Sequence, residues 1–200
     1  MRETIITPRI HSPDEYNIAA MPGSESIQRI VAIQNKLKSL LGNAIWLTPP
    51  NTLHSTLMEI TCKAEYTGLT RKEHFMHWYE RYNDKARETI AQFPPIDAHF
   101  NELYVSPEAI ILQAADPAPF NNIRESLLKN TVLPEQTKTP PTIAHCTIAR
   151  YNDKISLDEA REKVSEIAAD LTVHISEFKL MKDLGPDFHP VHLETYTLRA

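Results

Sequence analysis

A segment of ten residues occurs twice in this chain. Residues 48–57 read TPPNTLHSTL, and residues 139–148 read TPPTIAHCTI. The first threonine, both prolines, the histidine and the threonine two residues after the histidine recur at identical spacing, and both copies end on an aliphatic residue. This repetition predicts a fold made of two similar halves, each of which carries one copy of the segment.

The rest of the sequence predicts an alternation of helices and strands around these two segments. Apolar residues at helical spacing indicate helices at residues 24–41 and 71–93, and a third helix after Asp116. A fourth helix is expected after Ser156, with Ala160, Val164, Ile167 and Ala168 facing inward. Short apolar runs between turn residues indicate strands, with a loop at 131–141. The expected strands are 16–20, 45–47, 53–60, 96–104, 109–113, 142–151, 171–181 and 191–198.

This order predicts an α+β fold that is internally duplicated and two-lobed. Each lobe would be an antiparallel-rich sheet with helices packed on its outer face, and a central cleft would lie between the lobes. A chain of 200 residues can bury a proper core, and with four glycines it offers no flexible linker. We therefore expect residues 1–200 to form a single domain, and we expect a monomer.

Charge and cysteine content limit the classes of partner. The net charge of −5 argues against an extended nucleic-acid surface, which needs a basic patch, although a pocket for one phosphate remains compatible with it. Cys62 and Cys146 are too few for a disulfide framework, and the N-terminal residues lack a secretory signal pattern. No apolar run reaches the roughly 18 residues of a membrane span. These features predict a cytoplasmic protein that does not enter a membrane.

The repeated segments place a histidine and a threonine two residues apart. On a strand such residues point to the same face, so His54 with Thr56, and His145 with Thr147, would each present an imidazole beside a hydroxyl. If the two halves are related by a pseudo-twofold axis, both pairs can meet at one ligand. The arrangement suits a phosphate group.

The chemistry expected of such a site is hydrolysis of a phosphodiester. One histidine can take a proton from the attacking water while the other gives a proton to the leaving oxygen. The threonine hydroxyls can donate hydrogen bonds to the non-bridging oxygens. This scheme requires no metal and no cofactor.

A His-x-Thr triplet alone is weak evidence in a chain with nine histidines. A third match, at residues 174–176, lacks both the proline pair that precedes the repeated triplets and the aliphatic residue that follows them. We therefore interpret His174 as a strand residue with no catalytic part.

The two motifs resemble those of the two-histidine phosphoesterase superfamily. The second motif, HCTIAR at residues 145–150, and the lead-in WLTPP at residues 46–50 are similar to those of the RNA 2′,3′-cyclic phosphodiesterases. The resemblance implies opening of a cyclic phosphate on a nucleotide or RNA end, without metal or cofactor. It implies that His54 donates a proton to the leaving ribose oxygen, that His145 activates water, and that Thr56 and Thr147 bind phosphate. A pseudo-symmetric site leaves the opposite assignment of the two histidines open.

Other residues give weaker signals. Arg150 and Tyr151 are candidate substrate-binding residues, for a phosphate or a base. Trp46 and Tyr104 could line the cleft, but large aromatic residues are more often part of a core. The pairs His74 with His77 and His189 with His192 lack the ligand pattern of a zinc site. We expect no metal site at either pair.

Two alternatives of different classes remain at this point. The chain could be a metal-dependent phosphohydrolase that uses its additional histidines, or a non-catalytic module that binds nucleotides or RNA ends. Sensitivity to a chelator would indicate the first alternative, and binding without turnover would indicate the second.

Overall fold

The computed structural model describes residues 15–61, 69–133, 140–153, 155–183 and 190–199. Its helices are α1 (Ser24–Leu41), α2 (Arg71–Ile90), α3 (Ala118–Asn130) and α4 (Leu157–Val164), with short 3₁₀ turns at Gly42–Ala44 and Pro50–Thr52. Its strands are β1 (Glu15–Ala20), β2 (Ile45–Leu47), β3 (Ser55–Thr61), β4 (Ile96–Val105), β5 (Ala109–Ala114), β6 (His145–Tyr151), β7 (Leu171–Ile175), β8 (Glu177–Asp183) and β9 (Val191–Thr197).

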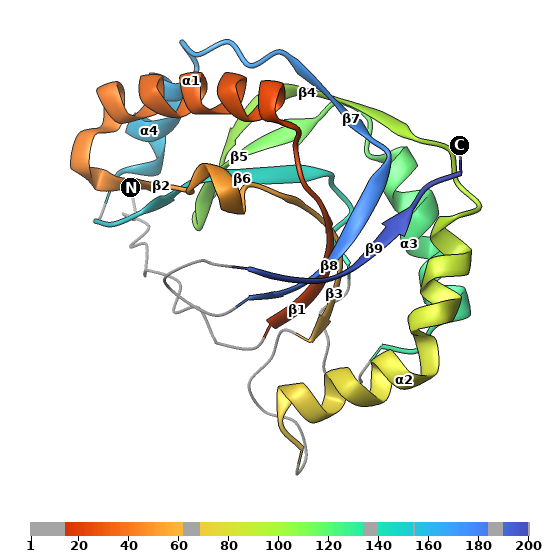
Figure 1. Cartoon of the computed structure of the whole chain (residues 1–200). Coiled ribbons are helices and arrows are strands. Elements are labelled where there is room, and N and C mark those ends of the chain that lie inside the picture. The colour runs from red at the N-terminus through yellow and green to blue at the C-terminus, as the bar shows by residue number, and fades with distance from the viewer. Residues whose placement is uncertain (1–14, 62–68, 134–139, 154, 184–189, 200) are drawn as a thin grey trace.

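These strands form one antiparallel sheet in the order β7-β4-β5-β6-β3-β1-β8-β9, and β2 pairs with β6 beside this path. We call β3-β1-β8-β9 the first half and β6-β5-β4-β7 the second half. The sheet curls, and the helices lie on its outside (Figure 1): α1 and α4 contact the second half, while α2 and α3 contact the first. The predicted α+β fold with two lobes is confirmed.

Most predicted elements are confirmed within a few residues. Helix α1 has the predicted bounds, buries Ile30, Ile33 and Leu37, and ends at Gly42, whose positive φ of 56° suits glycine. Helix α2 starts after a capping box in which Thr70 and Glu73 exchange hydrogen bonds. Both helices therefore start where their sequences indicate, and α2 ends at Ile90, before the predicted end at residue 93.

Three predicted elements differ most from the structure. The single strand predicted at residues 171–181 is two strands, because the chain leaves its pairing with β4 after Ile175 and pairs with β1 from Glu177. The strand predicted at 142–151 starts at His145. Helix α4 ends at Val164, which leaves the predicted inward-facing Ala168 exposed and buries Ala169 instead.

The duplication is visible in the strand register. In the first half, Thr56 pairs with Ala19 and Met58 with Ile18, so Leu57 is an extra residue that forms a β-bulge. In the second half, Thr147 pairs with Ile111 and Ala149 with Ile110, so Ile148 is the extra residue. Both bulges therefore fall on the aliphatic residue that ends the repeated segment.

A buried polar side chain donates hydrogen bonds to each bulge, and we call these two side chains, Gln34 and Arg124, the bulge clamps. In the second half, Gln34 Nε2 of α1 donates to the carbonyls of Ile148 at 2.8 Å and Thr48 at 2.7 Å. In the first half, Arg124 of α3 donates from Nε to Leu57 O and from Nη2 to Thr56 O, both at 2.8 Å. Since α1 follows β1 and α3 follows β5 in the chain, each half supplies the helix that holds the bulge of the other half.

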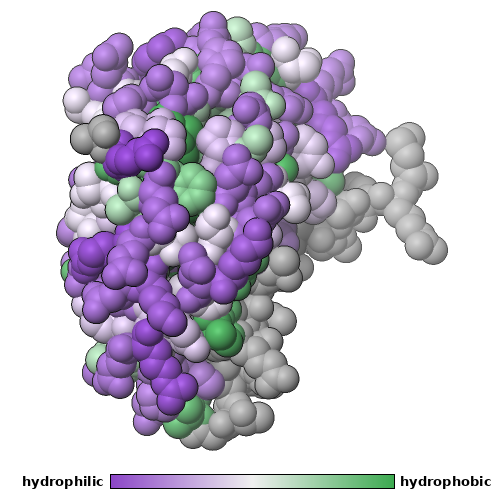
Figure 2. All heavy atoms as spheres, turned by 90° about the vertical axis from the view of Figure 1, so that its right-hand side faces the viewer, coloured by the Kyte–Doolittle hydropathy of each residue, from purple (hydrophilic) through white to green (hydrophobic). Residues whose placement is uncertain are grey.

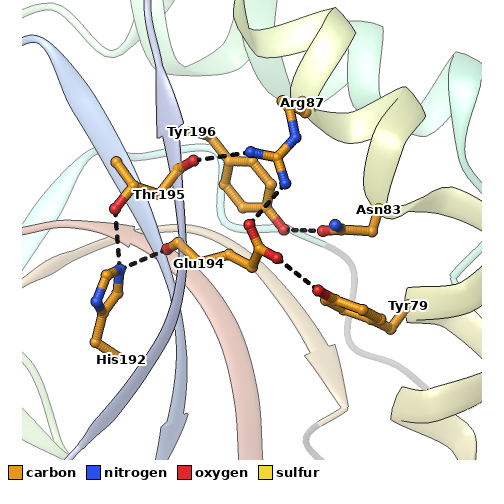
Figure 3. Close-up of polar contacts among 7 residues, drawn as sticks. All are labelled: Tyr79, Asn83, Arg87, His192, Glu194, Thr195 and Tyr196. Atoms are coloured by element: carbon orange, nitrogen blue, oxygen red, sulfur yellow. Dashed lines mark hydrogen bonds and ion pairs between the residues drawn. The ribbon is translucent and has the colours of Figure 1, made fainter.

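A polar network attaches α2 to the C-terminal strand β9 (Figure 3). The Glu194 carboxylate accepts from Arg87 at 2.6 Å and from the Tyr79 hydroxyl at 2.5 Å, and Tyr196 donates to Asn83 Oδ1 at 2.6 Å. Burial raises the pKa of Tyr196, so its hydroxyl stays protonated as the donor in this pair. This network fixes the outermost strand of the first half.

The face on which α2 and α3 lie is largely hydrophilic, with scattered apolar spots (Figure 2). No helix in the described part of the chain combines the length and the apolar character that crossing a bilayer requires.

Replacing Arg124 by methionine tests the contribution of the bulge clamp to stability. The Arg124 side chain is 3% exposed and also donates to Ile143 O and Asn121 Oδ1. Methionine keeps much of the apolar volume but leaves buried carbonyls without donors, so we expect the free energy of unfolding to fall by about 3 kcal/mol. Urea denaturation measures this change.

Arg161→Met is the matched control. Arg161 is half-exposed and pairs with Asp158 at 3.3 Å on the surface of α4, so its loss should cost less than about 0.5 kcal/mol. Equal losses in the two variants would contradict a special role for the clamp.

Candidate active site

The two repeated segments meet where the halves of the sheet join. Ser55 of β3 pairs with Cys146 of β6 in antiparallel register. Continued by one residue in each direction, this register places His54 opposite Thr147 and Thr56 opposite His145. Because alternate residues share a face, these four side chains lie on the face opposite to that of Ser55 and Cys146.

The other face of the same pair confirms this orientation. Ser55 and Cys146 line a small apolar space with Ile30 of α1, on the outer side of the sheet. Burial raises the pKa of the Cys146 thiol to about 12, and the backbone N–H of His54 lies within hydrogen-bonding reach of its sulfur. The buried thiol is therefore a core group, and the histidines belong to the inner face.

His54 lies one residue before β3, where the prediction had placed it within a strand. The proline pair starts a 3₁₀ turn at Pro50–Thr52, closed by a hydrogen bond from the Thr52 N–H to Pro49 O at 2.9 Å. His54 Nδ1 lies 2.8 Å from the Thr52 carbonyl, which can only accept, so Nδ1 carries a proton. Proton exchange at neutral pH therefore takes place at Nε2.

His145 is the first residue of β6 and is partly buried. Burial is the largest cause that lowers its pKa to about 4, and positive charge on His54, Arg124 and Arg150 lowers it further. The carboxylate of Glu59 acts in the opposite direction. The ring of His145 is therefore neutral at physiological pH and can accept a proton.

A cleft of about 370 Å³ opens beside these residues on the inner face of the second half. It has the size of a small-molecule site. Its walls include His145 and Thr147 of the motif and Arg150 from the end of β6. The other lining residues are Tyr104, Ser106, Pro107, Glu108, Ala109, Ile111 and Ile143.

Arg150 and Tyr151 have different surroundings, although the sequence offered both as substrate contacts. Arg150 lines the cleft. Tyr151 is 5% exposed, and its hydroxyl donates to Ser106 O at 3.0 Å, which supports the turn between β4 and β5. Tyr151 therefore does not line the cleft as Arg150 does, because adjacent strand residues face opposite sides.

For Tyr104 the sequence left two possibilities open, the cleft and the core. The residue is 43% exposed and lines the cleft. The sequence of β4 alternates at its start, where Asp97 and His99 are exposed between buried neighbours. Continuing that alternation alone gives the wrong face, because a register shift between Phe100 and Glu102 intervenes.

The remaining histidines have other surroundings. His174 Nδ1 lies 2.8 Å from Asp97 Oδ1, and His192 Nε2 lies 2.7 Å from Glu194 O. Among the described residues, no three His, Cys, Asp or Glu side chains are grouped as for a metal ion, and this includes His74 and His77. His189, together with Thr139 and Cys62, lies outside the described residues.

Several solved structures share this fold. TT0787 of Thermus thermophilus matches with a TM-score of 0.64 and 16% identity over 92% of this chain and 98% of that one. Escherichia coli LigT complexed with NADP⁺ matches with a TM-score of 0.60 and 15% identity over 94% and 100% of the two chains. A structure described as a phosphoesterase gives a TM-score of 0.59 at 14% identity over 94% and 100%. At these identities the likeness shows the fold alone.

No curated protein sequence matches the chain significantly. The family model of the 2′-5′ RNA ligase superfamily, however, matches residues 52–187, which is more than half of the chain and contains both histidine motifs. The chain therefore belongs to the 2′-5′ RNA ligase superfamily, the two-histidine phosphoesterases that its repeated segments resemble.

Proposed function

We propose that this chain hydrolyses a cyclic phosphodiester of a nucleotide or RNA end by acid–base catalysis between His54 and His145. The single observation that carries the proposal is the antiparallel pairing of Ser55 with Cys146. This pairing brings two His-x-Thr motifs that are distant in sequence onto neighbouring strands. Two imidazoles and two hydroxyls on one face match the requirements of a phosphoryl group.

The reaction has one bond-forming and one bond-breaking step at phosphorus. A water oxygen attacks the phosphorus while His145 takes its proton. The bond from phosphorus to a ribose oxygen breaks, and His54 Nε2 gives that oxygen a proton. The products are a phosphomonoester and a free hydroxyl, and Thr56 and Thr147 donate hydrogen bonds to the non-bridging oxygens throughout.

The environments of the two histidines support this assignment. A lowered pKa keeps His145 neutral, as a base must be before it accepts a proton. The hydrogen bond from His54 Nδ1 to the Thr52 carbonyl orients the imidazole ring and makes Nε2 the nitrogen that transfers the proton. A carbonyl or carboxylate orients other catalytic histidines in the same way. Arg150 supplies positive charge at the cleft for a phosphate oxygen.

The ligands of a structural neighbour support a nucleotide as substrate. Escherichia coli LigT has been crystallised with 3′-AMP, with ATP, with NADP⁺ and with phosphate. The neighbouring fold thus accommodates both a nucleotide and inorganic phosphate. We extend this property to the cleft beside His145.

Alanine variants of the two histidines test the proposal. His54→Ala and His145→Ala should each lower kcat for a 2′,3′-cyclic nucleotide by roughly 10²- to 10⁴-fold, because each removes one proton-transfer group. Circular dichroism should show an intact fold. His174→Ala is the matched control, since it removes the histidine of the third His-x-Ser/Thr triplet, and its activity should stay near that of the unchanged protein.

Two other results would point to the alternative functions. Loss of activity in a chelator, restored by a divalent ion, would indicate a metal-dependent phosphohydrolase. Binding of nucleotides with no turnover across cyclic phosphates would indicate a binding module. Full activity in either histidine variant would rule out the acid–base scheme.

The pKa of His145 gives a separate prediction. A base with a pKa of about 4 in the free protein loses activity only as the pH falls towards 4, so the acid limb of kcat/KM should lie well below 6.5. NMR titration of the His145 ring should likewise show little protonation above about pH 5.

Charge variants should move this titration in opposite directions. Arg150→Met removes a positive charge and should raise the pKa of His145, whereas Glu59→Gln removes a negative charge and should lower it. A His145 ring that titrates near the ordinary value of 6.5, or that shifts alike in both variants, would contradict the electrostatics described here.

A further inference from the structure

The second half of the sheet carries an aromatic side chain on the same inner face as its motif. Thr147 pairs with Ile111 of β5, and Ile111 pairs with Tyr104 of β4. Directly paired residues of antiparallel strands point to the same face, so the three side chains form one row. Two strand spacings separate Thr147 from Tyr104, roughly 10 Å between backbones. A tyrosine side chain and a bound sugar can together bridge that distance.

The first half carries a different residue at the equivalent position. There Thr56 pairs with Ala19 of β1, and Ala19 pairs with Lys179 of β8. Lys179 thus corresponds to Tyr104, and it lies 3.6 Å from the Glu177 carboxylate. The duplicated sheet therefore has one aromatic side and one charged side, with the two motifs between them.

The surroundings of Tyr104 suit a flat apolar group. Tyr104 is 43% exposed and lies in a cleft whose other walls include Pro107, Ile111 and Ile143. Two hydrogen bonds hold the turn after β4. The Tyr151 hydroxyl donates to Ser106 O, and the Ser106 N–H donates to Ala109 O at 3.0 Å. An exposed aromatic face on a fixed support is a stacking platform, and every nucleobase has a face that can stack on it.

We propose that Tyr104 is the platform on which the nucleobase of the substrate stacks, and that the nucleoside therefore lies over the second half of the sheet. The proposal rests on the proposed function for the position of the phosphate between the motifs. It adds the direction in which the substrate extends from that phosphate. It also makes Tyr104 the residue that distinguishes a nucleotide from a cyclic phosphate without a base.

The test compares two substrates that share the reacting group. Adenosine 2′,3′-cyclic phosphate carries a base, and propane-1,2-diol cyclic phosphate has the same five-membered ring without one. Tyr104→Ala should lower kcat/KM for the adenosine substrate by roughly 5- to 100-fold, mainly through KM, and leave the base-free substrate unchanged. Tyr104→Phe and Tyr104→Trp should keep the preference for the nucleotide.

Lys179→Ala is the control from the equivalent position in the first half. It should leave the ratio of the two kcat/KM values unchanged. An equal loss on both substrates in Tyr104→Ala would show a structural role for Tyr104 and overturn the proposal. If Tyr104→Ala leaves kcat/KM unchanged for both substrates, the base lies elsewhere, and this result would overturn the proposal as well.

A binding experiment separates this proposal from the proposed function. Calorimetry with 3′-AMP and with inorganic phosphate needs no turnover. If no cyclic phosphate is hydrolysed but Tyr104→Ala weakens only 3′-AMP, the proposed reaction fails and the stacking platform stands. If hydrolysis is present and both ligands bind Tyr104→Ala as they bind the unchanged protein, the platform fails and the proposed reaction stands.

Discussion

The antiparallel pairing of Ser55 with Cys146 is the contact on which the site depends. It joins the two halves of the sheet through the centre of the two repeated segments, so the histidines and threonines on either side of the pair fall on one face. A shift of one residue in this pairing would turn one of the two motifs towards the apolar space under α1, because side chains alternate along a strand. Ser55 and Cys146 are buried, so a shift would place a histidine in a buried apolar position. Burying the imidazole there without a hydrogen-bond partner would cost free energy, which disfavours the shift.

The reciprocal bulge clamps make this contact a property of the whole fold. Gln34 and Arg124 reach across from helices that follow the opposite half in the chain, so neither half holds its own motif in shape. The two clamps differ in charge, and this difference reaches the site. Burial lowers the pKa of Arg124 to about 10, which leaves it cationic at neutral pH, and its charge contributes to the lowered pKa of His145. One clamp is thus structural, while the other also biases one of the two histidines towards the neutral form.

Much of this could be predicted from the sequence because the relevant signals are local. Helical periodicity gave α1 its bounds, and the repeated segment singled out both histidines with their threonines. What could not be predicted depends on pairing between distant strands: the register at Ser55 and Cys146, the break at Ser176, and the shift in β4 that turns Tyr104 towards the cleft. The clamps left a weaker local trace. Gln34 lies on the buried face of its helix between Ile33 and Leu37, where a polar side chain requires a buried partner.

In the proposed reaction, duplication assigns catalysis and substrate recognition to different parts of the molecule. A pseudo-twofold site can hold a phosphate, since the phosphoryl oxygens are themselves nearly symmetric, but it cannot by itself fix the direction of an asymmetric substrate. Direction requires that equivalent positions differ, and the structure differs in the rows that flank the motifs: Tyr104 where the first half has Lys179, and Arg150 where it has Glu59. Arg150 and Glu59 also have opposite effects on the pKa of His145, which Arg150 lowers and Glu59 raises. In the proposed reaction, Arg150 and Glu59 therefore separate the roles of two otherwise equivalent histidines, and Tyr104 gives the bound nucleotide its direction.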